Sequence, residues 1–81
     1  MKIKLKYFAV YQEILGHESH MMDVEEGMTV HHIFDQVMKD SALKEWYFKS
    51  TLFAVNLNFV SSDYLIQAGD EIAFIPPMAG G

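Results

Sequence analysis

One amphipathic helix is the clearest element of this chain, and it constrains the fold more than any other feature. Thr29 suits the N-cap position, and the helix is expected to continue through Lys39 or Asp40. An apolar stripe follows the i, i+3, i+4, i+7, i+8 spacing and is formed by Val30, Ile33, Phe34, Val37 and Met38. One such stripe covers one face of a sheet, so the strand-like segments around it predict an α+β domain.

Short strand-like segments precede and follow this helix. In residues 2–8, lysines alternate with apolar side chains and mark a solvent-facing side. The other candidate strands are residues 18–24, 52–55, 59–60 and 71–75. Short helices are expected over 9–15 and 42–48, with an irregular stretch over 61–67. We therefore expect a mixed sheet of four to five strands packed on one main helix.

The length of 81 residues leaves room for one domain, and 51% of them are apolar. A chain this short buries about 60% of the surface of its unfolded form, so its core is thin. Trp46 and the pair Met21–Met22 are expected to contribute to packing. Cysteine is absent, which excludes disulfides and favours a reducing compartment, so a cytoplasmic location is expected. The opening residues do not resemble a signal peptide, and no apolar run is long enough to span a membrane.

Charge narrows the range of partners. Six lysines, no arginine and eleven acidic residues give a net charge of −5. Such a chain is repelled by a phosphate backbone, and it lacks the residue best suited to bidentate phosphate and guanine contacts. Nucleic-acid binding is therefore not expected. An acidic surface favours a basic protein partner, or serves solubility alone.

Four histidines raise the question of a metal site. His17 and His20 are three residues apart on a strand or turn and are expected to point to opposite faces. His31 and His32 are adjacent on the helix and diverge by about 100°. Neither pair converges, so no metal site is expected. The sequence also has no nucleophile elbow and no glycine-rich phosphate loop, so intrinsic catalysis is not expected.

The composition changes at the end of the sequence. Both prolines and two of the five glycines fall among Pro76, Pro77, Met78, Ala79, Gly80 and Gly81. Successive prolines favour an extended stalk, and glycines add no side chains that would widen it. Six extended residues reach about 20 Å, at about 3.3 to 3.6 Å each. We expect a domain over residues 1–75 and an extended tail over residues 76–81 that threads its carboxylate into another protein; the alternative is an ordinary frayed end.

A free α-carboxylate needs activation before it can react. It is an anion at neutral pH and neither an electrophile nor a useful nucleophile. Coupling it to AMP would create a good leaving group, and attack by a sulfide equivalent would then leave a thiocarboxylate. Bare glycines suit a narrow channel that keeps water away from an acyl adenylate.

The strand before the tail gives a second indication. Ile72 and Phe74 fall on one of its faces and Ala73 and Ile75 on the other, so both faces are apolar. One helix covers only one of them, which predicts an exposed apolar docking surface beside the tail. The alternative is a central strand buried on both faces. Phe8, on the lysine side of the first strand, favours the exposed surface.

A series of short motifs runs through most of the chain. They are Leu5–Ala9, Glu13–Gly16, Thr29–Val30, Ala54–Asn56, Val60–Ser61, Leu65, Gly69–Pro77 and Gly80–Gly81. The most specific is the last part, in which Gly-Asp-Glu precedes an apolar strand, two prolines, two further residues and Gly-Gly. Together these motifs resemble the small subunit of molybdopterin synthase, a family of ubiquitin-like β-grasp sulfur carriers. Met78 stands where the family more often has valine, and residues 39–53 match poorly.

The resemblance implies a β-grasp fold and a sulfur carrier that is no enzyme on its own. Gly81 would be adenylated by an activating enzyme that uses ATP, and sulfur from a donor protein would convert it to a thiocarboxylate. The tail, Pro76 to Gly80, would then enter the large synthase subunit, where the sulfur would build the dithiolene on a pyranopterin precursor. The resemblance implies an apolar docking patch for both partners, formed by Phe8, Phe59 and Ile75. It also implies a heterotetrameric synthase and no cofactor bound to this chain.

Two alternatives stay open at the level of the sequence. The same carrier chemistry could deliver sulfur to the thiazole of thiamine or to tRNA, because the partner sets the substrate. A non-covalent β-grasp interaction module with an inert tail would need no activation at all.

Overall fold

A five-stranded sheet and three short helices make up the computed structural model, which describes residues 1–76. The strands are β1 (Lys2–Tyr7), β2 (Ser19–Asp23), β3 (Leu52–Val55), β4 (Asn58–Val60) and β5 (Glu71–Ile75). The helices are α1 (Val10–Leu15), α2 (Val30–Val37) and α3 (Lys44–Ser50). In this part of the chain no helix has the length and apolar character needed to cross a membrane.

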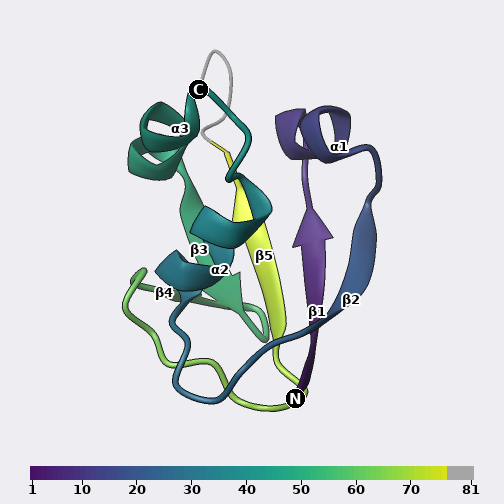
Figure 1. Ribbon diagram of the computed structural model, residues 1–81, viewed down its shortest axis with the longest axis vertical. Coiled ribbons are helices and arrows are strands. Elements are labelled where there is room, and N and C mark those ends of the chain that lie inside the picture. Colours follow the sequence, from purple (N-terminus) through teal and green to yellow (C-terminus); the bar gives the residue numbers. More distant parts are fainter. Residues whose placement is uncertain (77–81) are drawn as a thin grey trace.

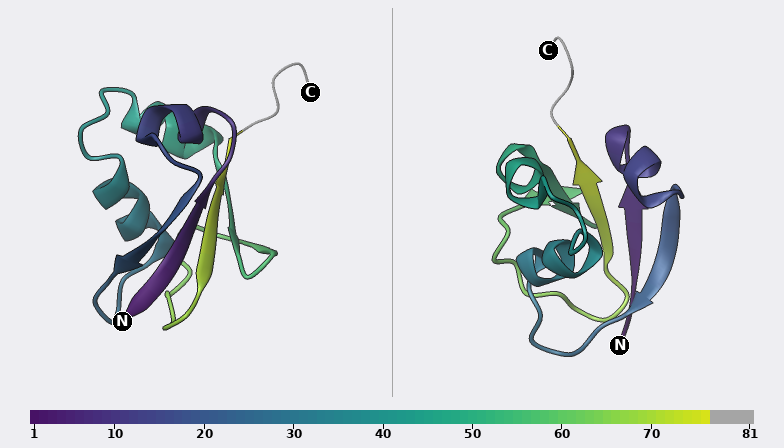
Figure 2. Two further views of the ribbon diagram at one scale, coloured as in Figure 1. Left: turned by 90° about the vertical axis from the view of Figure 1, so that its right-hand side faces the viewer. Right: turned by 45° about the horizontal axis from the view of Figure 1, so that its top comes forward.

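The strand order is β2-β1-β5-β3-β4 (Figure 1). β1 and β5 are parallel, and the other three neighbouring pairs are antiparallel. Strands from the two ends of the described chain therefore lie side by side in the middle of the sheet. Helices α2 and α3 lie on one face of the sheet (Figure 2). This arrangement confirms the predicted α+β fold with a mixed sheet, and it is the ubiquitin-like β-grasp.

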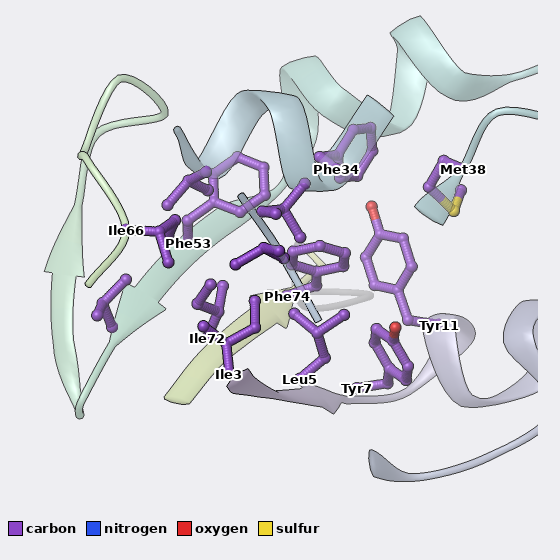
Figure 3. Packing of buried hydrophobic residues seen from close by; sticks show 14 residues of the cluster. Ile3, Leu5, Tyr7, Tyr11, Phe34, Met38, Phe53, Ile66, Ile72 and Phe74 are labelled. Carbon is purple, nitrogen blue, oxygen red and sulfur yellow. The ribbon is translucent and has the colours of Figure 1, made fainter. Parts of the chain in front are cut away.

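The core lies between α2 and the sheet (Figure 3). Val30, Ile33 and Phe34, three members of the predicted stripe, are fully buried on α2. The ring centroid of Phe34 lies 5.7 Å from that of Phe53 on β3 and 5.4 Å from that of Phe74 on β5. Burying a side chain of this size contributes about 1.5–3 kcal/mol. One helix thus holds together strands that are distant in sequence.

Several element boundaries differ from the predicted ones. β3 and β5 have the expected bounds, because a left-handed turn follows β3 and a proline follows β5. Helix α2 ends at Val37, since Met38 already leaves helical geometry as the C-cap. Helix α3 covers residues 44–50 instead of 42–48, with Leu43 at its N-cap. β1 ends at Tyr7 and not at residue 8, because the backbone turns at Ala9, where φ is 50°.

Candidate functional site

The face of the sheet opposite α2 and α3 carries a group of apolar side chains. Phe53 and Val55 of β3 are buried in the core, so the alternate residues Leu52 and Ala54 lie on the opposite face. The register of β3 and β4 pairs Ala54 with Phe59. Phe59 is 71% exposed, which is unusual for an aromatic side chain on a sheet.

β5 extends this surface toward the middle of the sheet. Its register with β3 pairs Ile75 with Leu52. The parallel ladder of β1 and β5 ends at Tyr7 and Phe74, so Phe8 and Ile75 follow at the same end of the sheet. Phe8 is exposed and Ile75 is half-buried. Ala73 alternates with the buried residues Ile72 and Phe74 and shares the face of Ile75. We call this surface the apolar patch; it consists of Phe8, Leu52, Phe59, Ala73 and Ile75.

Lysines border the patch on the β1 side. Lys2, Lys4 and Lys6 alternate with the buried residues of β1 and therefore share the helix-free face. The Nζ atom of Lys6 lies 5.9 Å from the centroid of the Phe8 ring and 3.6 Å from the carboxylate of Glu71. The patch is thus apolar in the middle and bordered by lysines, of which Lys2 pairs with Asp23 and Lys6 with Glu71.

The predicted docking residues share one face of the sheet. Phe8 and Ile75 lie side by side at the end of β5, whereas Phe59 lies on β4, the edge strand beyond β3, level with Ala73. Pro76, predicted to begin the tail, is buried directly after β5. The rest of the predicted tail, Pro77 to Gly81 with the reactive carboxylate, lies outside the described residues.

Leu52 is a patch residue that the sequence analysis missed. It is 56% exposed and adjoins Ile75 across the sheet. The signal was present in the sequence, because the alternation of residues 52–55 separates Leu52 from the buried residues Phe53 and Val55.

Asn56 and Asp70, which belong to two of the sequence motifs, meet at the start of β5 and have a structural role. Asn56 Nδ2 donates a hydrogen bond to Asp70 Oδ1 at 2.9 Å, and Asn56 Oδ1 accepts one from the backbone N–H of Glu71 at 3.0 Å. Asp70 is buried, and its Oδ2 accepts from the backbone N–H of Gln67 at 2.8 Å. These bonds join the β3–β4 turn to the start of β5, the strand that leads into the tail.

The expectation that His17 and His20 diverge is wrong. Their rings stack with centroids 4.5 Å apart, and the Tyr7 hydroxyl lies 2.7 Å from His20 Nε2. His17 precedes β2 and follows Gly16, where φ is 81°, so the alternation of a strand does not apply to it. Within residues 1–76, no three His, Cys, Asp or Glu side chains gather in an arrangement that could hold a metal ion.

Burial changes the proton affinities in this cluster. It lowers the pKa of His20, and the charge of His17 lowers that pKa further. Burial also raises the pKa of Tyr7 to about 12. Both groups therefore favour their neutral forms in the folded protein.

Trp46 and Met21 are not packing residues, contrary to the prediction. Trp46 is 62% exposed on α3, and Met21 is exposed on β2. Met22 alone of the methionine pair packs against the core. Successive strand residues point to opposite faces, so only one of two adjacent methionines can be inside.

The chain matches known proteins over its whole length. A family model described as the ThiS family matches residues 5–81. The molybdopterin synthase sulfur carrier subunit of Escherichia coli (strain K12) is 31% identical over 83 residues, which cover 98% of this chain and 99% of that protein. The subunit of the same name from Chlamydomonas reinhardtii is 29% identical over 83 residues and 100% of both chains. Among solved structures, SAMP1 from Haloferax volcanii has a TM-score of 0.83 and 26% identity, with 100% of both chains covered. The chain therefore belongs to the ThiS family and is similar to molybdopterin synthase sulfur carrier subunits.

Proposed function

We propose that this chain is a sulfur carrier of molybdenum cofactor biosynthesis and forms the small subunit of a two-protein molybdopterin synthase. Relatives that carry this name match it over its full length. The structural observation that carries the proposal is the position of the apolar patch, which extends from Phe59 on β4 to Ile75 at the end of β5, the strand that precedes residues 77–81. The chain supplies the reactive C-terminal carboxylate and is not an enzyme by itself.

The proposed chemistry takes place at the carboxylate of Gly81. The carboxylate attacks the α-phosphate of ATP on an activating enzyme, which forms an acyl adenylate and releases pyrophosphate. A sulfide equivalent from a donor protein attacks the acyl carbon and displaces AMP, leaving a thiocarboxylate. Its sulfur then attacks a carbon of the pyranopterin precursor and displaces an oxygen leaving group from that carbon, and water cleaves the acyl–sulfur bond and restores the carboxylate. Two such transfers supply the two sulfurs of one dithiolene.

The apolar patch serves as the docking surface for this cycle. Phe8, Phe59 and Ile75 contact first the activating enzyme and then the large synthase subunit, while Pro76 to Gly80 lead the carboxylate into each active site. Exposed aromatic side chains are typical anchors of protein interfaces. ATP is used by the activating enzyme, and this chain itself binds no cofactor. We place the cycle in the cytoplasm, with the carrier and the large subunit in a heterotetramer.

Mass spectrometry tests the carrier chemistry. The full chain is incubated with its activating enzyme, ATP and a sulfur source, and the mass of its C-terminal fragment is measured. We expect exchange of one oxygen for sulfur on that fragment. Deletion of Gly81, or extension by one residue, should abolish the exchange while thermal unfolding stays unchanged. Sulfur transfer by either altered chain would contradict a mechanism at the terminal carboxylate.

A patch variant tests the docking. Phe59→Asp places a charge on the most exposed aromatic side chain of the apolar patch, so we expect it to weaken binding to the activating enzyme and to the large subunit by at least about tenfold. Leu65→Asp is the matched control, because Leu65 is also exposed but lies in the segment that bridges to Thr29. Equal binding by the two variants would contradict docking on the patch. The carrier is finally combined with each candidate partner in turn. The product that forms, a pterin, a thiazole or a thiolated RNA, identifies the pathway that the carrier serves.

A further inference from the structure

The row of lysines beside the apolar patch includes one ammonium group without an acidic partner in the described part of the chain. Lys2 pairs with Asp23, and Lys6 pairs with Glu71. Lys4 lies between the two other lysines on β1, is exposed, and makes no such ion pair. Glu71 is opposite Lys4 in the ladder of β1 and β5, but its carboxylate is bound by Lys6. The Lys4 ammonium is therefore available to a group outside the chain.

The acidic residues of the chain are concentrated away from this row. The strands of the helix-free face carry three lysines and two acids, Lys2, Lys4, Lys6, Asp23 and Glu71. The rest of the sequence carries the other three lysines and nine acids. A negatively charged partner surface is repelled by most of this chain and attracted to the lysine row. The charge distribution thus turns the helix-free face toward an acidic partner.

Lys4 is close enough to the apolar patch to be covered by a protein that docks there. Lys6 is opposite Ala73 in the β1–β5 ladder, and Lys4 is two residues before Lys6. Strands about 4.8 Å apart, with a rise of about 3.3 Å per residue, place the Lys4 Cα atom about 8 Å from that of Ala73 and about 14 Å from that of Ile75. An interface of about 800 Å² on each partner has a radius of about 16 Å. It therefore includes Lys4 whether it is centred on Ala73 or on Ile75.

Covering Lys4 removes water from its ammonium group. A charge that loses its water without gaining a partner is costly. The neighbour of Lys4 on the β2 side is Met21, an exposed apolar side chain that offers no charge in compensation. A carboxylate on the docked protein would replace the lost water with a charge-assisted hydrogen bond.

We propose that a protein which docks on the apolar patch presents a carboxylate to Lys4, so that its surface is apolar opposite Phe59 and Ile75 and acidic opposite β1. The inference rests on the proposed function. It applies to the activating enzyme and to the large synthase subunit alike, because both cover the same patch in the proposed cycle. The contact serves specificity, since a protein with a basic residue at this position is rejected by repulsion between like charges.

Charge variants of Lys4 test the contact by calorimetric titration of the full chain with the purified large subunit and, separately, with the activating enzyme. Lys4→Met keeps the apolar stem and removes the charge, and it should raise the Kd about fivefold; Lys4→Glu should raise it at least about tenfold. Lys39→Glu is the matched control and should change the Kd less than about twofold. Lys39 is also exposed and without an ion pair among the described residues, but it follows α2 on the other face of the sheet.

The salt dependence of binding gives a second readout. An increase from about 50 to about 500 mM NaCl should weaken binding of the unaltered chain more than that of Lys4→Met, because salt screens the ion pair that the variant lacks. Thermal unfolding of each variant shows that it is folded at the temperature of the titration. Equal salt dependence of the two chains would contradict an ion pair at Lys4.

The outcomes separate this inference from the proposed function. If Phe59→Asp weakens binding while Lys4→Met binds either protein as the unaltered chain does, the patch docks the partner and the inference at Lys4 alone is overturned. If Lys39→Glu weakens binding as much as Lys4→Glu, the effect comes from net charge, and the inference is again overturned. If Phe59→Asp binds normally, docking on the patch is itself wrong.

Discussion

Leu57 occupies a backbone conformation that a branched L-amino acid rarely adopts. Its φ is 72° and that of Asn56 is 51°, which places two residues with positive φ at the centre of the β3–β4 turn. Such turns match the twist of a hairpin and favour Asn followed by Gly. Asn56 fits this preference, but the side chain of Leu57 is 92% exposed and gains no packing in return. The turn therefore stores strain at a single residue.

Replacing Leu57 with glycine should stabilise the protein. Leu57→Gly creates the preferred Asn-Gly turn, and we expect the free energy of unfolding to rise by roughly 1 kcal/mol, measured by urea denaturation. Leu65→Gly is the control, because Leu65 is also exposed but does not have positive φ. That change should lower the free energy of unfolding, since glycine adds entropy to the unfolded chain. A destabilised Leu57→Gly variant would contradict the strain argument.

Single residues were predictable from the sequence where strand alternation governs them. Ile72 and Phe74 share the buried face that the pattern indicates, whereas the exposure of Phe59 was indicated only by the resemblance to a known family. His17 was not predictable, because a left-handed glycine turns the chain before β2 and brings its ring onto His20. The buried role of Asp70 depends on Asn56, fourteen residues earlier in the sequence, and no local pattern reveals such a bond.

Helix α2 depends on a capping box at its start. The Thr29 hydroxyl accepts a hydrogen bond from the backbone N–H of His32 at 3.2 Å, and His32 Nδ1 accepts from the backbone N–H of Thr29 at 3.0 Å. Two N–H groups that would otherwise lack partners are thereby satisfied. Because α2 contributes most of the helix side of the core, its start matters for the whole domain.

Removing the cap should weaken the fold without altering the patch. We expect Thr29→Ala to lower the free energy of unfolding by about 1 kcal/mol, measured by urea denaturation. Thr29→Ser keeps the hydroxyl and should retain most of the stability. Affinity for the large subunit, measured well below the unfolding midpoint, should stay unchanged, because the patch lies on the opposite face of the sheet. Equal stability of the alanine and serine variants would show that the cap contributes nothing.

The bounds of helices and strands were predictable where their ends carry a local sequence signal. β3 ends at a turn with positive φ and β5 ends before a proline, and both have the expected bounds. The ends of α2 and α3 lack such signals, since Met38 and Leu43 are both compatible with a longer helix. Tertiary packing decides these boundaries, and a single sequence does not show it.

The stability of the whole domain should depend on pH through the Tyr7–His20 pair. The pKa of His20 is lower in the folded protein than in the unfolded chain, so the unfolded chain binds a proton first as the pH falls. Stability should therefore decrease below about pH 6.5, the ordinary pKa of histidine. The pKa of Tyr7 is raised to about 12, so stability should also decrease above about pH 10, where the unfolded chain ionises first.

Urea denaturation at pH values on either side of these limits measures the effect. His20→Gln should flatten the loss of stability on the acid side, and Tyr7→Phe should flatten the loss on the alkaline side. His17→Gln removes only the smaller of the two causes that lower the pKa of His20, so it should reduce the acid loss in part. If the His20→Gln variant loses as much stability on the acid side as the unaltered protein, the assignment to His20 is wrong.

The strand order of the whole molecule was the least predictable feature. The sequence indicated the strands and the main helix, and hence an apolar sheet face without a helix on it. The pairing of β1 with β5 joins residues such as Leu5 and Ile72, which are far apart in the chain and share no local signal. Only the resemblance to a known family indicated this topology in advance.

The central pairing of β1 with β5 has a consequence for how the protein is made. Every truncated chain that stops before residue 71 lacks the strand that joins β1 to β3, so its two halves have no common sheet. Closing so long a loop is entropically costly until β5 is present. A ribosome must therefore have synthesised β5 before the complete sheet can form. The β1–β5 pairing therefore delays formation of the sheet until the ribosome has released residues 71–75.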